Sequence, residues 1–168
     1  KNGFTRDQYR IYCSVETHSS IEKGVKIAGF GKNNLVKVPV NDDLSMDPEA
    51  LEALIEADLS QGFIPTAVVG TIGTTGTTAI DPIDAIGQIC ERYKVWFHID
   101  AAYAGTALIL PEFADLRLGI DRADSFVFNP HKWMLTHFDC SAYFVKDARR
   151  LRRTFEILPE YLKTDSRG

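Results

Sequence analysis

Short apolar and β-branched runs alternate along the chain with segments whose apolar residues recur at helical spacing. This alternation is typical of β-α-β units, which build a mostly parallel sheet with helices on both faces. We therefore predict an α/β fold with right-handed connections. A binding crevice is expected at the carboxyl ends of its strands. The predicted strands are 10–15, 35–40, 66–72, 95–99, 125–128 and 141–145.

Three capping signals predict where helices begin. Asp47 stands directly before Pro48 and predicts a helix that ends near residue 62. Asp81 also precedes a proline and predicts a helix that runs to residue 93. Ser19 and Glu22 have the spacing of a capping box, which predicts a helix toward residue 29.

Composition narrows the class of protein. The chain has 168 residues, of which 45% are hydrophobic and 25% are charged, so it can bury a core of about one domain. Its formal net charge of −4 gives no general attraction for nucleic acid or an anionic membrane surface, and we expect neither as a partner. No apolar run approaches the ~18 residues of a membrane span, and the first residues do not resemble a signal peptide. We therefore expect a cytoplasmic protein.

Several site chemistries find no support in the sequence. The cysteines, at positions 13, 90 and 140, are far apart and form no C-x-x-C pair, so we expect free thiols and no zinc ribbon. His131, His137 and Asp139 fit no known ligand spacing, and no metal site is predicted. The sequence has no dinucleotide-binding fingerprint after a strand, no P-loop and no G-x-S-x-G elbow. The basic run 146–153 is typical of the solvated face of a surface helix.

Polar residues follow three of the predicted strands, at 73–75, 100–103 and 129–132. Asp100 ends an apolar run, so its carboxylate is expected to be partly buried and to need a cation or a strong donor. It is then either a helix cap or loop acid, or an anion that holds a bound heterocyclic cation.

Lys132 and His18 each have two interpretations. Lys132 follows Asn129-Pro130, which we expect to stop the strand without continuing into a helix, and apolar or aromatic residues stand at 126, 128 and 133–135. A lysine desolvated among such residues favours its neutral amine, which can form a Schiff base. The alternative is a solvated loop lysine whose stem covers Trp133. His18 is either a cap or packed side chain at a helix start, or a flat ring that stacks on an aromatic ligand.

Together these segments resemble the pyridoxal-phosphate-dependent group II amino-acid decarboxylases, in the branch of the aromatic-L-amino-acid decarboxylases. The resemblance extends from about residue 9 to residue 168. The segments that carry it are His18-Ser19-Ser20, Gly73-Thr74-Thr75, His98-Ile99-Asp100-Ala101-Ala102-Tyr103-Ala104-Gly105, Asn129-Pro130-His131-Lys132-Trp133 and Phe138-Asp139-Cys140-Ser141-Ala142.

The resemblance implies a role for each catalytic candidate. Lys132 would form the Schiff base with pyridoxal 5'-phosphate until the substrate amine takes its place. Asp100 would pair with the pyridine nitrogen and keep it protonated, which makes the ring an electron sink. His18 would stack on one ring face, and Ala102 would lie against the other.

Further cofactor contacts are implied in the same way. Thr75 would hydrogen-bond near the ring substituents or the substrate carboxylate. Asn129, together with His131, would help to hold the phosphate.

The resemblance also implies an organisation larger than this chain. Residues 1–168 would be the central segment of the large cofactor domain of a fold type I enzyme, because the chain starts without methionine and ends in a polar stretch. The N-terminal part, a mobile catalytic loop and a small C-terminal domain would lie outside it. Such enzymes are homodimers with their sites at the subunit interface.

The implied reaction converts an L-amino acid, expected to be aromatic, to its amine and CO2. The surroundings of Tyr103 and Trp133, together with the segment 138–141, resemble the aromatic branch more than the glutamate or cysteine-sulfinate branches. One alternative is an aldehyde synthase that uses the same cofactor and consumes oxygen; His18 favours the decarboxylase, and the discriminating loop residue lies outside the chain. Another is a non-catalytic protein of the same fold, against which the joint presence of Lys132, Asp100 and His18 argues.

Overall fold

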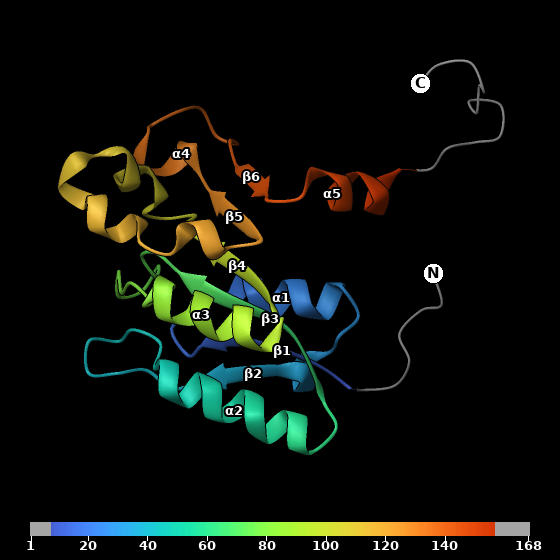
Figure 1. The fold of residues 1–168 in the computed structure, drawn as a ribbon. Coiled ribbons are helices and arrows are strands. Elements are labelled where there is room, and N and C mark those ends of the chain that lie inside the picture. The colour runs from blue at the N-terminus through green and yellow to red at the C-terminus, as the bar shows by residue number, and fades with distance from the viewer. Residues whose placement is uncertain (1–7, 157–168) are drawn as a thin grey trace, which may run out of the picture.

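The computed structural model describes residues 8–156, which contain one six-stranded sheet (Figure 1). Its order is β2-β1-β3-β4-β5-β6; the first five strands are parallel and β6 is antiparallel to β5. The predicted mostly parallel sheet is therefore confirmed, with strand ends that differ from the prediction by two residues or fewer. The strands are β1 (Tyr9–Ser14), β2 (Leu35–Val38), β3 (Ile64–Thr71), β4 (Trp96–Asp100), β5 (Ser125–Phe128) and β6 (Ala142–Val145).

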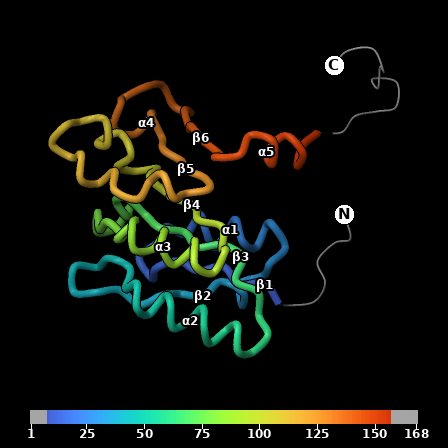
Figure 2. Tube along the Cα trace, viewed as in Figure 1, coloured from blue at the N-terminus to red at the C-terminus, as the bar shows by residue number. Residues whose placement is uncertain are grey.

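Helices cover both faces of this sheet. The connection from β1 to β2 runs in one direction along the sheet, whereas those from β2 to β3 and from β3 to β4 run in the other. Because parallel crossovers are right-handed, α1 lies on one face while α2 and α3 lie together on the other (Figures 1 and 2). The helices are α1 (Ser19–Ile27), α2 (Pro48–Ser60), α3 (Ile83–Tyr93), α4 (Pro130–Trp133) and α5 (Ala148–Phe155). Short 3₁₀ turns are η1 (Lys32–Asn34), η2 (Gly105–Ile109), η3 (Pro111–Arg117) and η4 (Ile120–Arg122).

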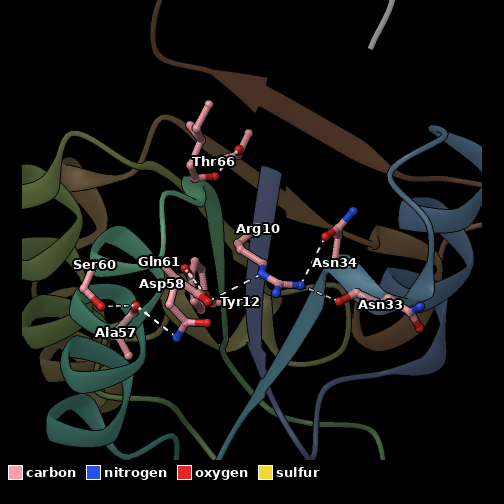
Figure 3. A network of polar contacts seen from close by, with 10 residues as sticks. Arg10, Tyr12, Asn33, Asn34, Ala57, Asp58, Ser60, Gln61 and Thr66 are labelled. Atoms are coloured by element: carbon pink, nitrogen blue, oxygen red, sulfur yellow. Dashed lines mark hydrogen bonds and ion pairs between the residues drawn. The ribbon is translucent and has the colours of Figure 1, made fainter. Parts of the chain in front are cut away.

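The main core lies between the sheet and the α2–α3 layer. Leu51, Ile86 and Phe97 are almost wholly buried there. A polar network ties β1 to α2 at the edge of this core (Figure 3): the Tyr12 hydroxyl donates to Asp58 Oδ2 at 2.7 Å, and Arg10 Nε lies 3.5 Å from Asp58 Oδ1. Burial and this hydrogen bond raise the pKa of Tyr12, so it acts as a neutral donor.

The capping predictions have mixed outcomes. Asp47 caps α2 as predicted, because its carboxylate accepts from the backbone N–H groups of Glu49 and Ala50. The capping box at Ser19 is wrong: His18 is the N-cap of α1, and Glu22 instead pairs with Lys26 on the next turn.

The cap predicted at Asp81 is also wrong, for a reason that bears on the site. The N-cap position of α3 is Pro82, and no side chain of the described residues caps this helix. Asp81 is 1% exposed and turns inward, where it accepts the N–H groups of Met46 at 2.8 Å and Thr71 at 2.7 Å. A carboxylate next to a proline therefore ties β3 to the 41–46 loop.

Two absences concern the described residues only. No helix between residues 8 and 156 is both long and apolar enough to cross a membrane. Within the same range, no three His, Cys, Asp or Glu side chains gather as they would around a metal ion. All three cysteines are free, as predicted.

Candidate active site

A cavity of about 180 Å³ opens at the carboxyl ends of the strands. The chain leaves β1 in one direction and β3 in the other, and such a switch point is where α/β sheets leave a crevice for ligands. Every site residue predicted from the sequence lines this cavity except His131. The lining residues are His18, Ser20, Thr71, Gly73, Thr75, Asp100, Ala102, Tyr103, Asn129 and Lys132.

Asp100 is the last residue of β4 and is 8% exposed. Its neighbour Ile99 points into the core, so the alternation of the strand turns the carboxylate to the other face. Oδ1 accepts from the N–H of Ala102 at 3.0 Å. Oδ2 has no hydrogen bond to any described residue, which leaves it available to a ligand. Asp100 thus uses one carboxylate oxygen to hold the backbone that follows β4 and keeps the other available.

Lys132 lies on the single turn α4. The prediction that Asn129-Pro130 excludes a helix is wrong, because proline suits the first helical position and α4 begins at Pro130. The turn brings Nζ to 5.9 Å from the centre of the Tyr103 ring, at the cavity. The expected apolar cover from residues 133–135 is also absent from the described structure, since Leu135 is 87% exposed.

His18 combines the two interpretations of the sequence. Its Nδ1 accepts from the N–H of Ser20 at 3.2 Å and lies 2.9 Å from the Ser20 hydroxyl, so it caps α1. The residue is nevertheless exposed at the cavity. The cap fixes one nitrogen and leaves the ring face available for stacking.

The loop after β3 requires glycine at one position. Gly73 has a φ of +78°, and a Cβ placed there would lie 2.5 Å from the Cβ of Ala104. Thr74 is buried, and its Oγ1 accepts from the N–H of Ala79 at 3.0 Å and lies 2.6 Å from Thr77 Oγ1. These contacts hold the loop so that Thr75 lines the cavity.

Asn129 and His131 are separated by the structure. Asn129 lines the cavity, and its Oδ1 accepts from the Ser141 hydroxyl at 2.7 Å. His131 turns toward the 138–140 segment: its Nδ1 accepts from the N–H of Cys140 at 3.0 Å and lies 3.5 Å from Asp139 Oδ1. Both residues were predicted to help hold a phosphate. Only Asn129 lies where the prediction requires, at the cavity.

Thr71 is a cavity residue that the sequence interpretation missed. It is the last residue of β3, pairs in register with Asp100, and is 4% exposed. Its Oγ1 is buried and has no hydrogen-bond partner among residues 8–156. In the sequence, Thr71 is marked only by its place two residues before Gly73. Its pairing with Asp100 becomes visible only once the order of the strands is known.

Known proteins resemble the chain over nearly its full length. A sequence model described as the pyridoxal-dependent decarboxylase conserved domain matches residues 4–168. The chain belongs to the pyridoxal-dependent decarboxylase family. Human histidine decarboxylase is 47% identical over 160 residues, and the match covers 94% of this chain but 23% of that protein. The aromatic-L-amino-acid decarboxylase of Drosophila lebanonensis is 46% identical over 157 residues, which cover 94% of this chain and 38% of that protein.

Solved structures of this family share the fold. The Oryza sativa TDC with PLP and tryptamine has a TM-score of 0.88 and 40% identity, over 94% of this chain and 32% of that one. The Rhodiola rosea 4-hydroxyphenylacetaldehyde synthase has a TM-score of 0.86 and 35% identity, over 88% of this chain and 32% of that one. The fold is therefore that of fold type I decarboxylases, of which the chain spans about a third. The division into a central segment and outer parts stays a prediction.

The cavity fits the pyridoxal phosphate that names the family. A pyridine cofactor needs a carboxylate for its ring nitrogen and an amine for its carbonyl carbon, and Asp100 and Lys132 supply both. Thr71 Oγ1 and Asp100 Oδ2, which have no hydrogen bond within the described part of the chain, are polar atoms that a bound ring would satisfy.

Proposed function

We propose that the protein carrying this chain is a pyridoxal-phosphate-dependent decarboxylase of L-amino acids. The observation that carries the proposal is one cavity lined by Asp100, Lys132 and His18. A non-catalytic scaffold has no need to bring these three residues together. Family membership supports the same conclusion.

Each residue at the cavity has a separate role in the proposed reaction. When bound, the cofactor supplies a conjugated ring that accepts the electron pair left on the substrate when CO2 departs. With the cofactor bound, the Asp100 carboxylate would keep the pyridine nitrogen protonated, and Lys132 Nζ would provide the covalent anchor. His18 and Ala102 would confine the ring, while Thr75 and Asn129 would hold its substituents. Their common task is orientation, because the bond that breaks must stand perpendicular to the ring plane.

We further propose that the substrate has an aromatic side chain. Relatives named as histidine and aromatic-L-amino-acid decarboxylases support an aromatic or heteroaromatic group, as does the Catharanthus roseus tryptophan decarboxylase solved with L-tryptophan. In the chain itself, Tyr103 lines the cavity, and its ring forms an edge-to-face pair with that of Trp133, with 5.2 Å between the ring centres. A homodimer in the cytoplasm is part of the same proposal.

Borohydride reduction tests the lysine assignment. The full-length protein, loaded with pyridoxal phosphate, is reduced and digested, and the pyridoxyl peptide is mapped by mass spectrometry. We expect the adduct on Lys132, and its complete loss in Lys132→Ala. Lys32→Ala, which removes an exposed lysine on η1, is the matched control and should keep the adduct. An adduct that persists in Lys132→Ala would show that another amine anchors the cofactor.

Product analysis tests the reaction. A panel of L-histidine, L-tryptophan, L-tyrosine and L-glutamate is supplied to the reconstituted protein, and amine, aldehyde and hydrogen peroxide are measured. We expect amine from an aromatic member of the panel. Aldehyde with peroxide would instead favour a synthase, for which the Rhodiola rosea structure is the precedent among the neighbours.

A further inference from the structure

Thr71 carries a hydroxyl that the described protein does not satisfy. Only three buried side-chain polar atoms within residues 8–156 have no hydrogen-bond partner: Arg10 Nε, Thr71 Oγ1 and Thr106 Oγ1. Arg10 Nε still lies beside Asp58 in an ion pair. Of the two threonines, only Thr71 lines the candidate active-site cavity. A buried hydroxyl without a partner is costly, so its presence at a cavity points to a partner that binds there.

The backbone holds this hydroxyl in place. Asp81 Oδ2 accepts the N–H of Thr71 at 2.7 Å, and the N–H of Asp81 donates to the carbonyl of Thr71 at 2.9 Å. These bonds tie both sides of the Thr71 peptide to the start of the connection into α3. The branched Cβ of threonine further restricts rotation of the side chain. The side chain is therefore held at the cavity wall with few conformations open to it.

Asp100 stands beside Thr71 on the same wall. The two residues are register partners on adjacent parallel strands, which lie about 4.8 Å apart. Oδ1 of Asp100 is engaged by Ala102, whereas Oδ2 is not hydrogen-bonded within the described part of the chain. Thr71 Oγ1 and Asp100 Oδ2 thus belong to neighbouring residues and are both without a hydrogen bond in the described part of the chain, so one ligand could engage both.

We propose that Thr71 is a further cofactor-binding residue, whose hydroxyl hydrogen-bonds the polar edge of the pyridine cofactor next to Asp100. This inference rests on the proposed function and adds a second polar contact at the buried end of the cavity. A second contact at that end restricts rotation of the ring in its plane, which the carboxylate alone would leave freer.

Three substitutions separate this role from a structural one. Thr71→Val keeps the shape and removes the hydroxyl, Thr71→Ser keeps the hydroxyl, and Thr106→Val removes the other unpartnered threonine hydroxyl, which lies outside the cavity. Each full-length variant is prepared without cofactor, its Tm is measured, and pyridoxal phosphate is titrated by tryptophan fluorescence. We expect Thr71→Val to raise the Kd about tenfold, which corresponds to about 1.4 kcal/mol, without lowering the cofactor-free Tm. Thr71→Ser should stay near the wild-type Kd, and Thr106→Val should leave it unchanged.

Two results would overturn the inference. If Thr71→Val binds pyridoxal phosphate with the wild-type Kd, the hydroxyl does not contact the cofactor. If its cofactor-free Tm falls, the hydroxyl has a partner inside the protein. Failure of the proposed function gives a different result, because the wild type itself would then form no adduct on Lys132 or would release no amine from the substrate panel.

Discussion

Two of the loops that line the cavity are built in opposite ways. The 73–82 loop, between β3 and α3, is tied down by buried groups: Thr74 and Asp81 are each 1% exposed and fully engaged by backbone N–H groups or hydroxyls. The 129–141 segment, between β5 and β6, has no buried residue and is held by contacts of half-buried or exposed groups, such as Ser141 to Asn129. Both loops nevertheless lie at the same edge of the sheet.

The difference shows how rigidity is distributed around the site. The 73–82 loop, called the buried loop for its buried anchors Thr74 and Asp81, follows Thr71 and supplies Gly73 and Thr75 to the cavity. The exposed segment carries Lys132, the residue that we propose as the covalent anchor of the cofactor. Regions with few buried contacts open at low free-energy cost, so the less constrained loop carries the residue whose bonds would change in the proposed reaction.

Among substitutions in the two loops, removal of the Asp81 carboxylate should lower the free energy of unfolding the most. Asp81→Ala leaves the N–H groups of Met46 and Thr71 buried without an acceptor. We expect the free energy of unfolding to fall by about 4 kcal/mol, at about 1–3 kcal/mol for each unsatisfied group. Denaturant unfolding of the full-length protein measures it. A loss below about 1 kcal/mol would mean that the buried loop does not depend on this carboxylate.

The pH dependence of stability sharpens the same point. Burial raises the pKa of Asp81 from 3.8 to about 6, although the two backbone hydrogen bonds oppose the shift. Because the folded protein holds this proton more tightly than the unfolded chain, the contribution of Asp81 to stability is greatest below its unfolded pKa and is lost as pH rises through about 6. Relative to Asp81→Asn, the wild type should lose about 2–3 kcal/mol between pH ~4 and pH ~8. Parallel slopes for the two proteins would contradict the assignment.

Most of the fold could be predicted from the sequence because it depends on local patterns. Buried parallel strands are continuous apolar runs, and Asp47 with Pro48 marks a helix start without help from other residues. Asp81 has the same local pattern, yet it is not a cap, because its partners Met46 and Thr71 are distant in sequence. Local spacing cannot distinguish a cap from a buried acceptor.

The candidate site shows the same limit. Asp100, His18 and Lys132 could be found because each follows a strand or belongs to a recognisable motif. Thr71 could not, since its significance arises from its register with Asp100 and from a hydroxyl left unpaired. His131 was predicted at the cavity from its motif, but its ring turns to the backbone of Cys140.

A hydroxyl deletion in the buried loop should have an intermediate effect. Thr74→Val removes the oxygen that accepts from the N–H of Ala79 and contacts Thr77. We expect a loss of about 1–2 kcal/mol in the free energy of unfolding, because that oxygen is buried. Denaturant unfolding measures the loss, and a neutral result would show that Thr77 alone can satisfy the Ala79 N–H.

The matched deletion in the exposed segment should have the smallest effect. Ser141→Ala removes the hydrogen bond to Asn129 Oδ1, but both groups are accessible to water, which replaces the lost partner. We expect the free energy of unfolding to change by less than about 0.5 kcal/mol. The Kd for pyridoxal phosphate should rise by no more than a few fold, since Asn129 gains freedom to rotate without losing its amide. If Ser141→Ala instead destabilises the protein as much as Thr74→Val does, the 129–141 segment is as firmly held as the buried loop, and the contrast between the two fails.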